Sequence, residues 1–301
     1  MTSVATLRIG TRQSRLALAQ AAIAVDALHP IVDRASLVPV ATRGDAISAR
    51  QPNGRWVATD GQFTRELERA LLEGRVDLVV HSYKDLPTEP VHGLVIGAVL
   101  ERADPRDCLI TRDGRGLDEL PFGARIGTSS PRRAAQLAAA RADLIAMPIR
   151  GNVESRILRL EAGDLDGIVL AAAGLDRLEI PVPSSARLPL DLMLPAPAQG
   201  ALALQVRAGD ATLRSMLAEI EHRPTRIAVE AERRLLRRIG GGCLAPLGAL
   251  GEVHDGELRL RAAFEDARGA QVRAEARGPA AGADTVVAEV AGRIEREAVT
   301  A

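Results

Sequence analysis

The stretch "VDLVVHSYKDLP", residues 76–87, joins an apolar run to a charged pair. Val76–Val80 is of strand length and apolar except for Asp77, which is typical of a strand buried on both faces of a parallel sheet. Lys84 and Asp85 follow its carboxyl end, where ligands bind in open α/β sheets. Lys84 is the sole lysine among 39 Lys and Arg residues. The stretch therefore predicts an α/β fold with a polar site at a strand end. The alternative for Lys84 and Asp85 is a solvated charge pair at the strand exit.

Strand-like and helix-like segments alternate on both sides of this stretch. Further strands are predicted at Leu7–Gly10, Leu37–Ala41, Ala124–Gly127, Leu144–Met147 and Gly167–Ala171. Helices are predicted at Arg15–Leu28, with Ser14 as its cap, at Phe63–Glu73, and after each of the last three strands. This alternation predicts parallel sheets with helices on both faces. Because the pattern occurs in two sets, we expect two lobes.

The C-terminal part has a different pattern. A long helix is expected at Arg226–Ile239, followed by three strands at Leu247–Glu252, Glu257–Phe264 and Gln271–Arg277 and by a last helix at Asp284–Glu297. The predicted fold class is therefore α/β, with two lobes of mostly parallel sheet and a small C-terminal α+β domain with a three-stranded sheet. A long polar loop, functional or mobile, is expected at Thr42–Gly61.

Composition limits the classes of function. The net charge is zero and aromatic residues make up 2% of the chain, which argues against a nucleic-acid binder. No segment has the pattern of a signal peptide or a membrane span, so we expect a cytoplasmic protein. The two cysteines form no disulfide framework there and have no metal-ligand spacing.

The run "GTSSPRR", residues 127–133, follows a predicted strand and begins a helix. Thr128, Ser129 and Ser130 offer hydroxyl groups beside the free backbone N–H groups of a helix start, which bind anions. Arg132 and Arg133 lie in the first helical turn, where cations oppose the helix dipole. We therefore favour a ligand that supplies negative charge. The alternative is an ordinary N-cap with a solvated basic turn.

Other predicted strands also end in arginine. Arg12 and Ser14 follow the first strand, Arg150 and Arg156 lie around the cap Asn152, and Arg177 follows the last strand of the second lobe. Guanidinium groups bind carboxylates and phosphates through paired N–H donors. Together these residues predict a polyanionic ligand at the strand ends of both lobes.

The two cysteines have different surroundings. Cys243 follows three consecutive glycines in "IGGGCLAPLG", which let a backbone pass close to a large ligand and leave the sulfur accessible. Cys108 lies in a strand beside Leu and Ile, where a cysteine is a small apolar residue of the core. We expect the first to be functional and the second structural.

These motifs, in this order, resemble hydroxymethylbilane synthases, also called porphobilinogen deaminases. The matching runs are "LRIGTRQS" (7–14), "ELERALLEGRVDLVVHSYKDLP" (66–87), "DPRD" (104–107), "GTSSPRRAAQL" (127–137), "RGNVESR" (150–156), "AAAGLDR" (171–177), "LPAPAQGAL" (194–202) and "AERRLLRRIGGGCLAPLG" (231–248). The resemblance covers essentially the whole chain.

The resemblance implies a transferase of tetrapyrrole and haem biosynthesis. It would join four porphobilinogen units head to tail with loss of ammonia, and water would release the linear hydroxymethylbilane. The chain would grow on a dipyrromethane cofactor held by a thioether to Cys243, with Asp85 as the catalytic carboxylate. The resemblance assigns binding of cofactor or substrate to Arg12, Ser14, Lys84, Thr128, Ser129, Ser130, Arg132, Arg133, Arg150, Arg156, Arg177 and Gln199.

The resemblance also implies lobes like those of periplasmic binding proteins. We expect lobe 1 at residues 1–100 and 200–218, lobe 2 at 101–199 and the cofactor-attachment domain at 219–301. It implies a monomer that acts on a small molecule, without a metal, a nucleic acid or a membrane.

Two other functions share part of this pattern. A non-catalytic, two-lobed module that binds an anionic solute would need the arginines but neither Cys243 nor Asp85. A Schiff-base enzyme would use Lys84 as its nucleophile. A modified Cys243 distinguishes the transferase from both.

Overall fold

The computed structural model describes residues 6–42, 64–240 and 242–300 of the chain. The loop predicted at Thr42–Gly61 lies, apart from Thr42 itself, outside the described residues. Among the described residues, no helix is both long and apolar enough to cross a membrane.

The chain divides into two compact units. Unit 1 comprises Met1–Ala103 and Ala201–Arg226, and unit 2 comprises Asp104–Gly200 and Ile227–Ala301. Each unit therefore takes two separate stretches of sequence. The expected division into two lobes and a third domain, with its boundaries, stays a prediction.

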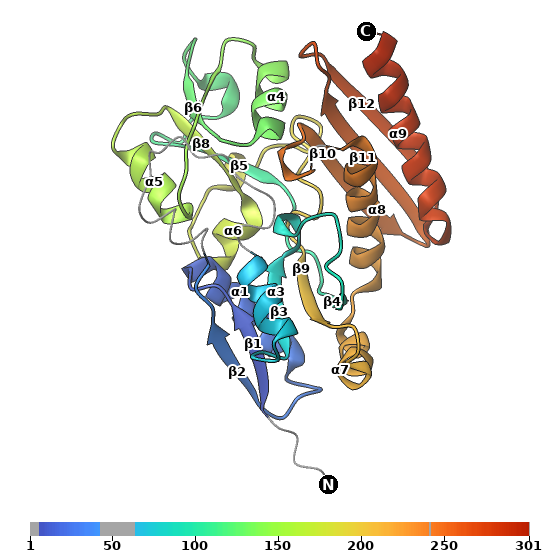
Figure 1. Cartoon of the computed structure of the whole chain (residues 1–301). Coiled ribbons are helices and arrows are strands. Elements are labelled where there is room, and N and C mark those ends of the chain that lie inside the picture. The colour runs from blue at the N-terminus through green and yellow to red at the C-terminus, as the bar shows by residue number, and fades with distance from the viewer. Residues whose placement is uncertain (1–5, 43–63, 241, 301) are drawn as a thin grey trace. The chain divides into compact units, whose positions relative to one another are not determined.

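Unit 1 contains a five-stranded sheet with the strand order β2-β1-β3-β9-β4 (Figure 1). β1 pairs in parallel with β2 and β3, whereas β9 is antiparallel to β3 and β4. The strands are β1 Leu7–Thr11, β2 Ala35–Pro39, β3 Leu78–Ser82, β4 Leu94–Val99 and β9 Leu202–Arg207. The apolar run predicted as a strand from Val76 thus forms β3, which begins at Leu78. β4 and β9 have no counterpart among the predicted strands.

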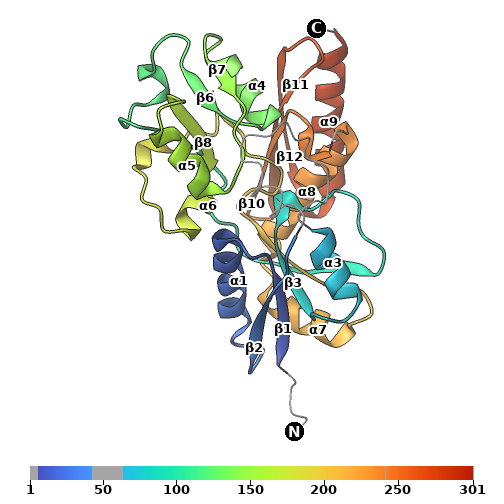
Figure 2. The same cartoon turned by 60° about the vertical axis from the view of Figure 1, so that its left-hand side comes forward.

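The helices α1, Arg15–Leu28, and α3, Arg65–Leu72, lie on opposite faces of this sheet (Figure 2). Successive side chains of a strand point to opposite faces. Val80 accordingly packs in the same cluster as residues of α1, and Val79 packs in the cluster of α3. The helix α7, Ala211–Leu217, contributes to the α1 side of the core. Because both faces are covered, Leu78, Val79 and Val80 at the start of β3 are all apolar.

Unit 2 contains a four-stranded sheet with the order β5-β8-β6-β7. Its strands are β5 Asp107–Thr111, β6 Arg125–Gly127, β7 Ile145–Met147 and β8 Gly167–Ala171. β6 is parallel to β7 and β8, and β5 is antiparallel to β8. Because of this reversal, the first residue of β5 lies opposite the last residue of β8. The start of β5 therefore lies at the carboxyl edge of the parallel strands.

Each parallel strand of this sheet leads into a helix. α4 Pro131–Ala140 follows β6, α5 Val153–Glu161 follows β7, and α6 Ala172–Arg177 follows β8. Ser130 caps α4 by accepting a hydrogen bond from Arg133 N, and Asn152 caps α5 by accepting one from Ser155 N. The predicted helix starts at these two residues are confirmed.

The end of the chain forms an antiparallel sheet and two helices. The elements are α8 Arg223–Ile239, β10 Leu247–His254, β11 Glu257–Glu265, β12 Gln271–Pro279 and α9 Ala283–Thr300. β10 and β11 are joined through Asp255 and Gly256, whose φ angles of 50° and 77° are those of a two-residue hairpin turn. The strands of the sheet follow in the order β10-β11-β12.

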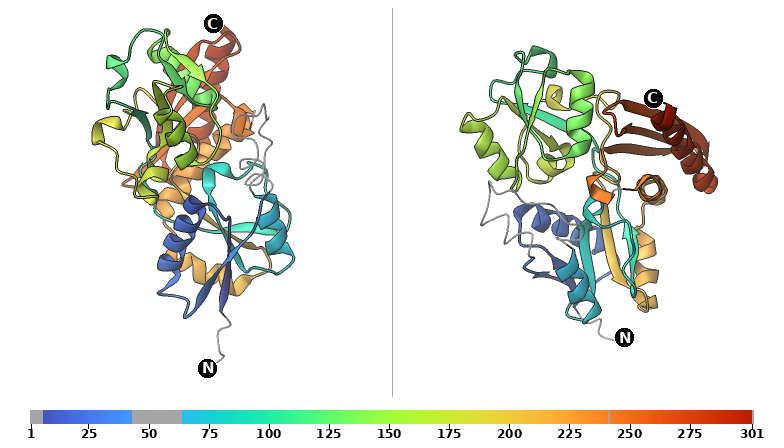
Figure 3. Two further views of the ribbon diagram at one scale, coloured as in Figure 1. Left: turned by 90° about the vertical axis from the view of Figure 1, so that its left-hand side faces the viewer. Right: turned by 45° about the horizontal axis from the view of Figure 1, so that its top comes forward.

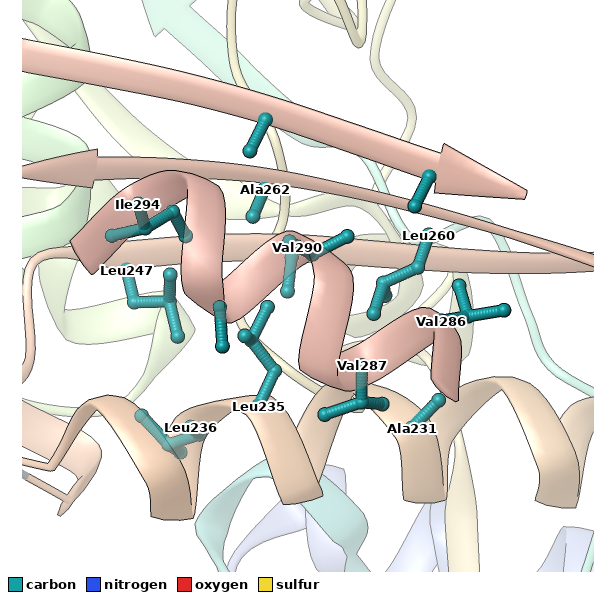
Figure 4. Packing of buried hydrophobic residues seen from close by; sticks show 14 of the residues in the cluster. Ala231, Leu235, Leu236, Leu247, Leu260, Ala262, Val286, Val287, Val290 and Ile294 are labelled. Atoms are coloured by element: carbon teal, nitrogen blue, oxygen red, sulfur yellow. The ribbon is translucent and has the colours of Figure 1, made fainter. Parts of the chain in front are cut away.

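One face of this sheet is covered by α9 (Figure 3). Leu247, Leu260 and Ala262 of the sheet pack in one buried cluster with Leu235 of α8 and Val290 of α9 (Figure 4). The expected fold class, with mostly parallel sheets and a C-terminal three-stranded sheet, is confirmed.

Candidate active site

The turn after β3 carries the charged pair of unit 1. Tyr83, Lys84 and Asp85 form a short 3-10 helix, η1 Tyr83–Asp85. Tyr83 is buried, and its backbone N–H donates to the carbonyl of Ala201 at 3.0 Å. Lys84 is half-buried and Asp85 is exposed. The buried tyrosine thus anchors the turn and presents Asp85 to solvent.

The carboxylate of Asp85 forms no hydrogen bond or ion pair with any residue that the structure describes. Its charge is therefore available to a ligand. An aspartate that only stabilised the turn would be expected to cap it or to pair with a cation.

Arg12 and Ser14 belong to the connection between β1 and α1. Ser14 caps α1, as predicted, by accepting a hydrogen bond from Ala17 N at 3.3 Å. Arg12 is half-buried directly after β1. Since β1 and β3 are parallel neighbours, Arg12 and Lys84 follow the ends of adjacent strands. The structure thus brings the predicted site residues of unit 1 to one edge of its sheet.

A buried polar chain behind this edge was not predicted from the sequence. Nε2 of His81 lies 3.0 Å from Oε1 of Gln205, whose side chain also hydrogen-bonds Glu68. An ionised carboxylate only accepts, so the Gln205 amide donates to Glu68 and accepts from His81. Burial lowers the pKa of His81 to about 4, and the charge of Arg12 adds to the effect. Burial raises the pKa of Glu68. Three residues distant in sequence form this chain, and no local motif marks them.

The predicted hydroxyl groups of unit 2 lie after β6 and bond to the chain itself. Ser129 Oγ donates to Ile149 O at 2.8 Å and accepts from Ile149 N at 3.0 Å. Thr128 is buried, and its Oγ1 accepts from Ser130 N at 3.2 Å. Ser129 thereby ties the β6–α4 connection to the residue before Arg150. These contacts bring two of the predicted motifs together.

Arg132 and Arg133 are both buried and both pair with Asp107. Nη1 of Arg132 donates to Asp107 Oδ2 at 2.7 Å, and Nη2 of Arg133 donates to Oδ1 at 2.6 Å. Burial raises the pKa of Asp107, but the two guanidinium groups outweigh it and hold this pKa below its ordinary value. Burial lowers the pKa of Arg132.

Asp107 was not among the residues predicted to contact Arg132 and Arg133. Their position in the first turn of α4 favoured a ligand as the source of negative charge, whereas Asp107 supplies one negative charge from within the chain. The binding of substrate or cofactor by Arg132 and Arg133 stays a prediction. Asp107 is the residue that sequence reasoning missed, although it ends the quoted run "DPRD".

Gln199 is also buried in this cluster. Its Nε2 donates to Asp107 Oδ1 at 3.0 Å and to the carbonyl of Pro105 at 2.8 Å. The carboxylate of Glu232 holds the neighbouring residue, since it accepts from Ala198 N at 2.6 Å. The predicted residue Gln199 is therefore held by the Asp107 side chain and the Pro105 backbone, both of unit 2.

The remaining predicted arginines are half-buried in unit 2. Nε of Arg156 donates to Gly151 O at 2.9 Å, and Nη2 of Arg177 donates to Gly200 O at 2.6 Å. Arg150 follows Ile149, which Ser129 holds. Burial lowers the pKa of Arg177 to about 10.

The backbone of Cys243 lies in a 3-10 turn, Gly242–Leu244, shortly after α8. Gly240 and Gly242 have φ angles of 86° and 55°, a backbone region that favours glycine. Cys108 is fully buried in β5, as predicted, and burial raises the pKa of its thiol to about 11. Cys108 is thus an inert core residue. Within the described chain, no group of three or more His, Cys, Asp or Glu side chains could hold a metal ion.

Comparison with known families covers most of the chain. Residues 7–215 match the family model described as "Porphobilinogen deaminase, dipyromethane cofactor binding domain", and residues 226–296 match "Porphobilinogen deaminase, C-terminal domain". The chain belongs to the porphobilinogen deaminase family.

Several porphobilinogen deaminases are similar over nearly their whole length. The enzyme of Desulforudis audaxviator is 50% identical over 275 residues, which is 90% of this chain and 88% of that protein. That of Syntrophotalea carbinolica is 47% identical over 261 residues, 86% of this chain and 82% of that protein. Among solved structures, the methionine-binding protein MetQ covers 71% of this chain and 89% of its own, at 11% identity and a TM-score of 0.43.

Membership of the porphobilinogen deaminase family makes the protein a transferase of tetrapyrrole biosynthesis with a dipyrromethane cofactor. The donors in unit 2 fit this group. Nε of Arg132 and Nε of Arg177 are buried without a hydrogen-bond partner among the described residues. Unpaired buried donors are rare in proteins, and the carboxylates of a dipyrromethane would satisfy them.

Proposed function

We propose that the protein is a hydroxymethylbilane synthase that joins four porphobilinogen units head to tail, with loss of ammonia, on a dipyrromethane linked through a thioether to Cys243. Water then releases the linear product. The observation that carries this proposal is the exposed carboxylate of Asp85. It has no partner among the described residues, and it lies at the same edge of the sheet as Arg12 and Lys84.

Asp85 would act on the aminomethyl group of porphobilinogen. In each condensation the bond from the methylene carbon to nitrogen breaks and ammonia leaves. A carbon–carbon bond then forms to the free α-carbon of a pyrrole, which loses its proton. The cofactor, when bound, supplies the first such α-carbon. The Asp85 carboxylate holds the ammonium leaving group and stabilises positive charge on the substrate's pyrrole nitrogen.

The cationic residues would hold the carboxylates of the substrate. Each porphobilinogen carries an acetate and a propionate, so every added unit brings two negative charges. Arg12, Ser14 and Lys84 would bind them in unit 1. In unit 2 the binding residues would be Thr128, Ser129, Ser130, Arg132, Arg133, Arg150, Arg156, Arg177 and Gln199. Paired N–H donors suit carboxylates, which explains the preference for arginine.

The proposal is tested by incubating the purified protein with porphobilinogen. We expect one ammonia to be released per porphobilinogen consumed, and one hydroxymethylbilane for every four. Stoichiometric binding without consumption would instead identify a solute-binding module. Trapping with borohydride should give no adduct on Lys84, and an adduct there would identify a Schiff-base enzyme.

A further inference from the structure

The carboxylate of Asp107 is fully buried and receives four N–H groups from three side chains. Oδ2 accepts from Nη1 of Arg132. Oδ1 accepts from Nε and Nη2 of Arg133, at 3.2 and 2.6 Å, and from Nε2 of Gln199 at 3.0 Å. One oxygen thus serves Arg132, and the other serves the remaining two residues.

Arg132 and Arg133 differ in how many of their guanidinium nitrogens donate a hydrogen bond within the chain. Every guanidinium nitrogen of Arg133 donates within the chain, because Nη1 also donates to Val169 O at 2.9 Å. Arg132 uses Nη1 for Asp107 and for Leu194 O, and its buried Nε has no partner among the described residues. Arg132 therefore has a buried nitrogen without a partner among the described residues, whereas each guanidinium nitrogen of Arg133 has one.

The charges in the cluster do not cancel. Two guanidinium groups face one carboxylate, which leaves one positive charge in a buried site at the start of α4. Both the helix dipole and the mutual repulsion of the arginines would turn these side chains away from the helix start. Asp107 opposes both effects, and the excess charge matches one carboxylate of a ligand.

We propose that Asp107 is a positioning residue for ligand capture: it fixes the Arg132 guanidinium so that its Nε meets a substrate carboxylate, with Arg133 and Gln199 as braces. This inference rests on the proposed function, in which Arg132 binds the substrate. The Asp107 carboxylate already accepts four hydrogen bonds from the chain and acts on the ligand through Arg132.

The test uses the full chain with Asp107→Asn, which keeps the shape and removes the charge, and Asp107→Glu, which keeps the charge and moves it. Asp104→Asn is the matched control, since Asp104 pairs instead with Arg106 and Arg187. The first measurement is the affinity for porphobilinogen, which is taken from the concentration that gives half of the maximal rise in melting temperature. This measurement does not depend on turnover. The second is cofactor loading by intact mass, and the third is KM and kcat per loaded molecule.

We expect both Asp107 variants to weaken porphobilinogen binding and to raise KM by about tenfold or more, with a much smaller change in kcat. Loading should fall in parallel, and Asp104→Asn should behave as wild type. A folded Asp107 variant with wild-type binding and KM would overturn the inference. Loss of folding in both variants would also overturn it, because Asp107 would then serve stability alone.

The same measurements separate this inference from the proposed function. A wild-type protein that binds porphobilinogen without consuming it refutes the proposed reaction, while the binding comparison still decides the role of Asp107. A wild-type protein that completes the reaction, with Asp107 variants equal to the control, refutes only the positioning role.

Discussion

Asp85 lies in the turn after β3 with an exposed carboxylate, whereas Asp107 begins β5 with a fully buried one. Both lie at carboxyl edges of parallel strands and beside cationic residues. Asp107 accepts four hydrogen bonds and is held ionised by two arginines, so its charge is committed to the protein. The carboxylate of Asp85, in contrast, forms no hydrogen bond or ion pair with a described residue. The comparison shows two kinds of aspartate. Asp85 can act on a substrate, whereas Asp107 can only fix the side chains of Arg132, Arg133 and Gln199.

The largest expected effect of a substitution is on turnover at Asp85. Asp85→Ala should lower kcat by about a hundredfold to ten-thousandfold, the contribution of a general acid or base, while the melting temperature stays near that of wild type. Steady-state kinetics and thermal unfolding check this. Asp33→Ala, another exposed aspartate of unit 1, is the control. Near-normal turnover in Asp85→Ala would refute its assigned role.

Asp107 should show the reverse pattern. Asp107→Ala leaves two buried guanidinium groups without a counter-charge, so the free energy of unfolding should fall by about 3–5 kcal/mol. Urea unfolding of this variant beside Asp85→Ala, expected within about 0.5 kcal/mol of wild type, measures the contrast directly. If the two variants were equally stable, the ion pairs of Asp107 with Arg132 and Arg133 would not contribute to the stability of the fold.

Glu232 is a second buried carboxylate that bonds to the chain itself. It accepts from Ala198 N at 2.6 Å and from Gly251 N at 2.7 Å. Glu232→Gln replaces one acceptor by an NH₂ group that faces a donor, and should cost about 1–3 kcal/mol of unfolding free energy. Glu230→Gln, on the same helix and partly exposed, should cost much less. Similar losses in both variants would contradict the role given to the Glu232 contacts.

His81 predicts a pH dependence of stability in unit 1. Its pKa of about 4 when folded lies below its ordinary value of 6.5, so between these values the unfolded chain binds a proton that the folded chain excludes. The contribution of His81 to stability is therefore complete above pH 6.5 and falls, by roughly 1.4 kcal/mol per unit, as the pH drops toward 4. Glu68, whose pKa is raised, acts in the opposite direction.

This dependence of the free energy of unfolding on pH is measured by urea unfolding at several pH values between 6.5 and 4. His81→Gln is the comparison. The variant retains an amide near Gln205 but does not titrate, so its slope should be smaller than that of wild type by nearly the whole His81 contribution. Identical slopes would mean that His81 is protonated at its ordinary pKa.

The smallest effect is expected at Lys84. Lys84→Arg keeps the positive charge beside Asp85 but replaces a compact ammonium by a planar fork. We expect a severalfold rise in KM for porphobilinogen with little change in stability. Unchanged kinetics would show that the single lysine of the chain has no special geometric role.

The sequence predicted local features better than distant ones. The helix Arg15–Leu28 and its cap Ser14 were predicted correctly because a cap and a following His-Pro pair are local signals. β9 was not predicted, since its pairing with β3 depends on residues more than a hundred positions away. Asp107, the partner of Arg132 and Arg133, was missed although it lies only 25 and 26 positions before them. Asp107 reaches them only because β5 runs antiparallel to β8, and no local pattern shows that direction.

The most direct test of the account is the intact mass of the purified wild-type protein, followed by peptide mapping. We predict a mass increase equal to two pyrrole units, located on Cys243 and absent in Cys243→Ser. Cys108→Ser, a change at the buried cysteine, should retain the adduct. An unmodified Cys243 in a protein that converts porphobilinogen to hydroxymethylbilane would contradict the proposed mechanism.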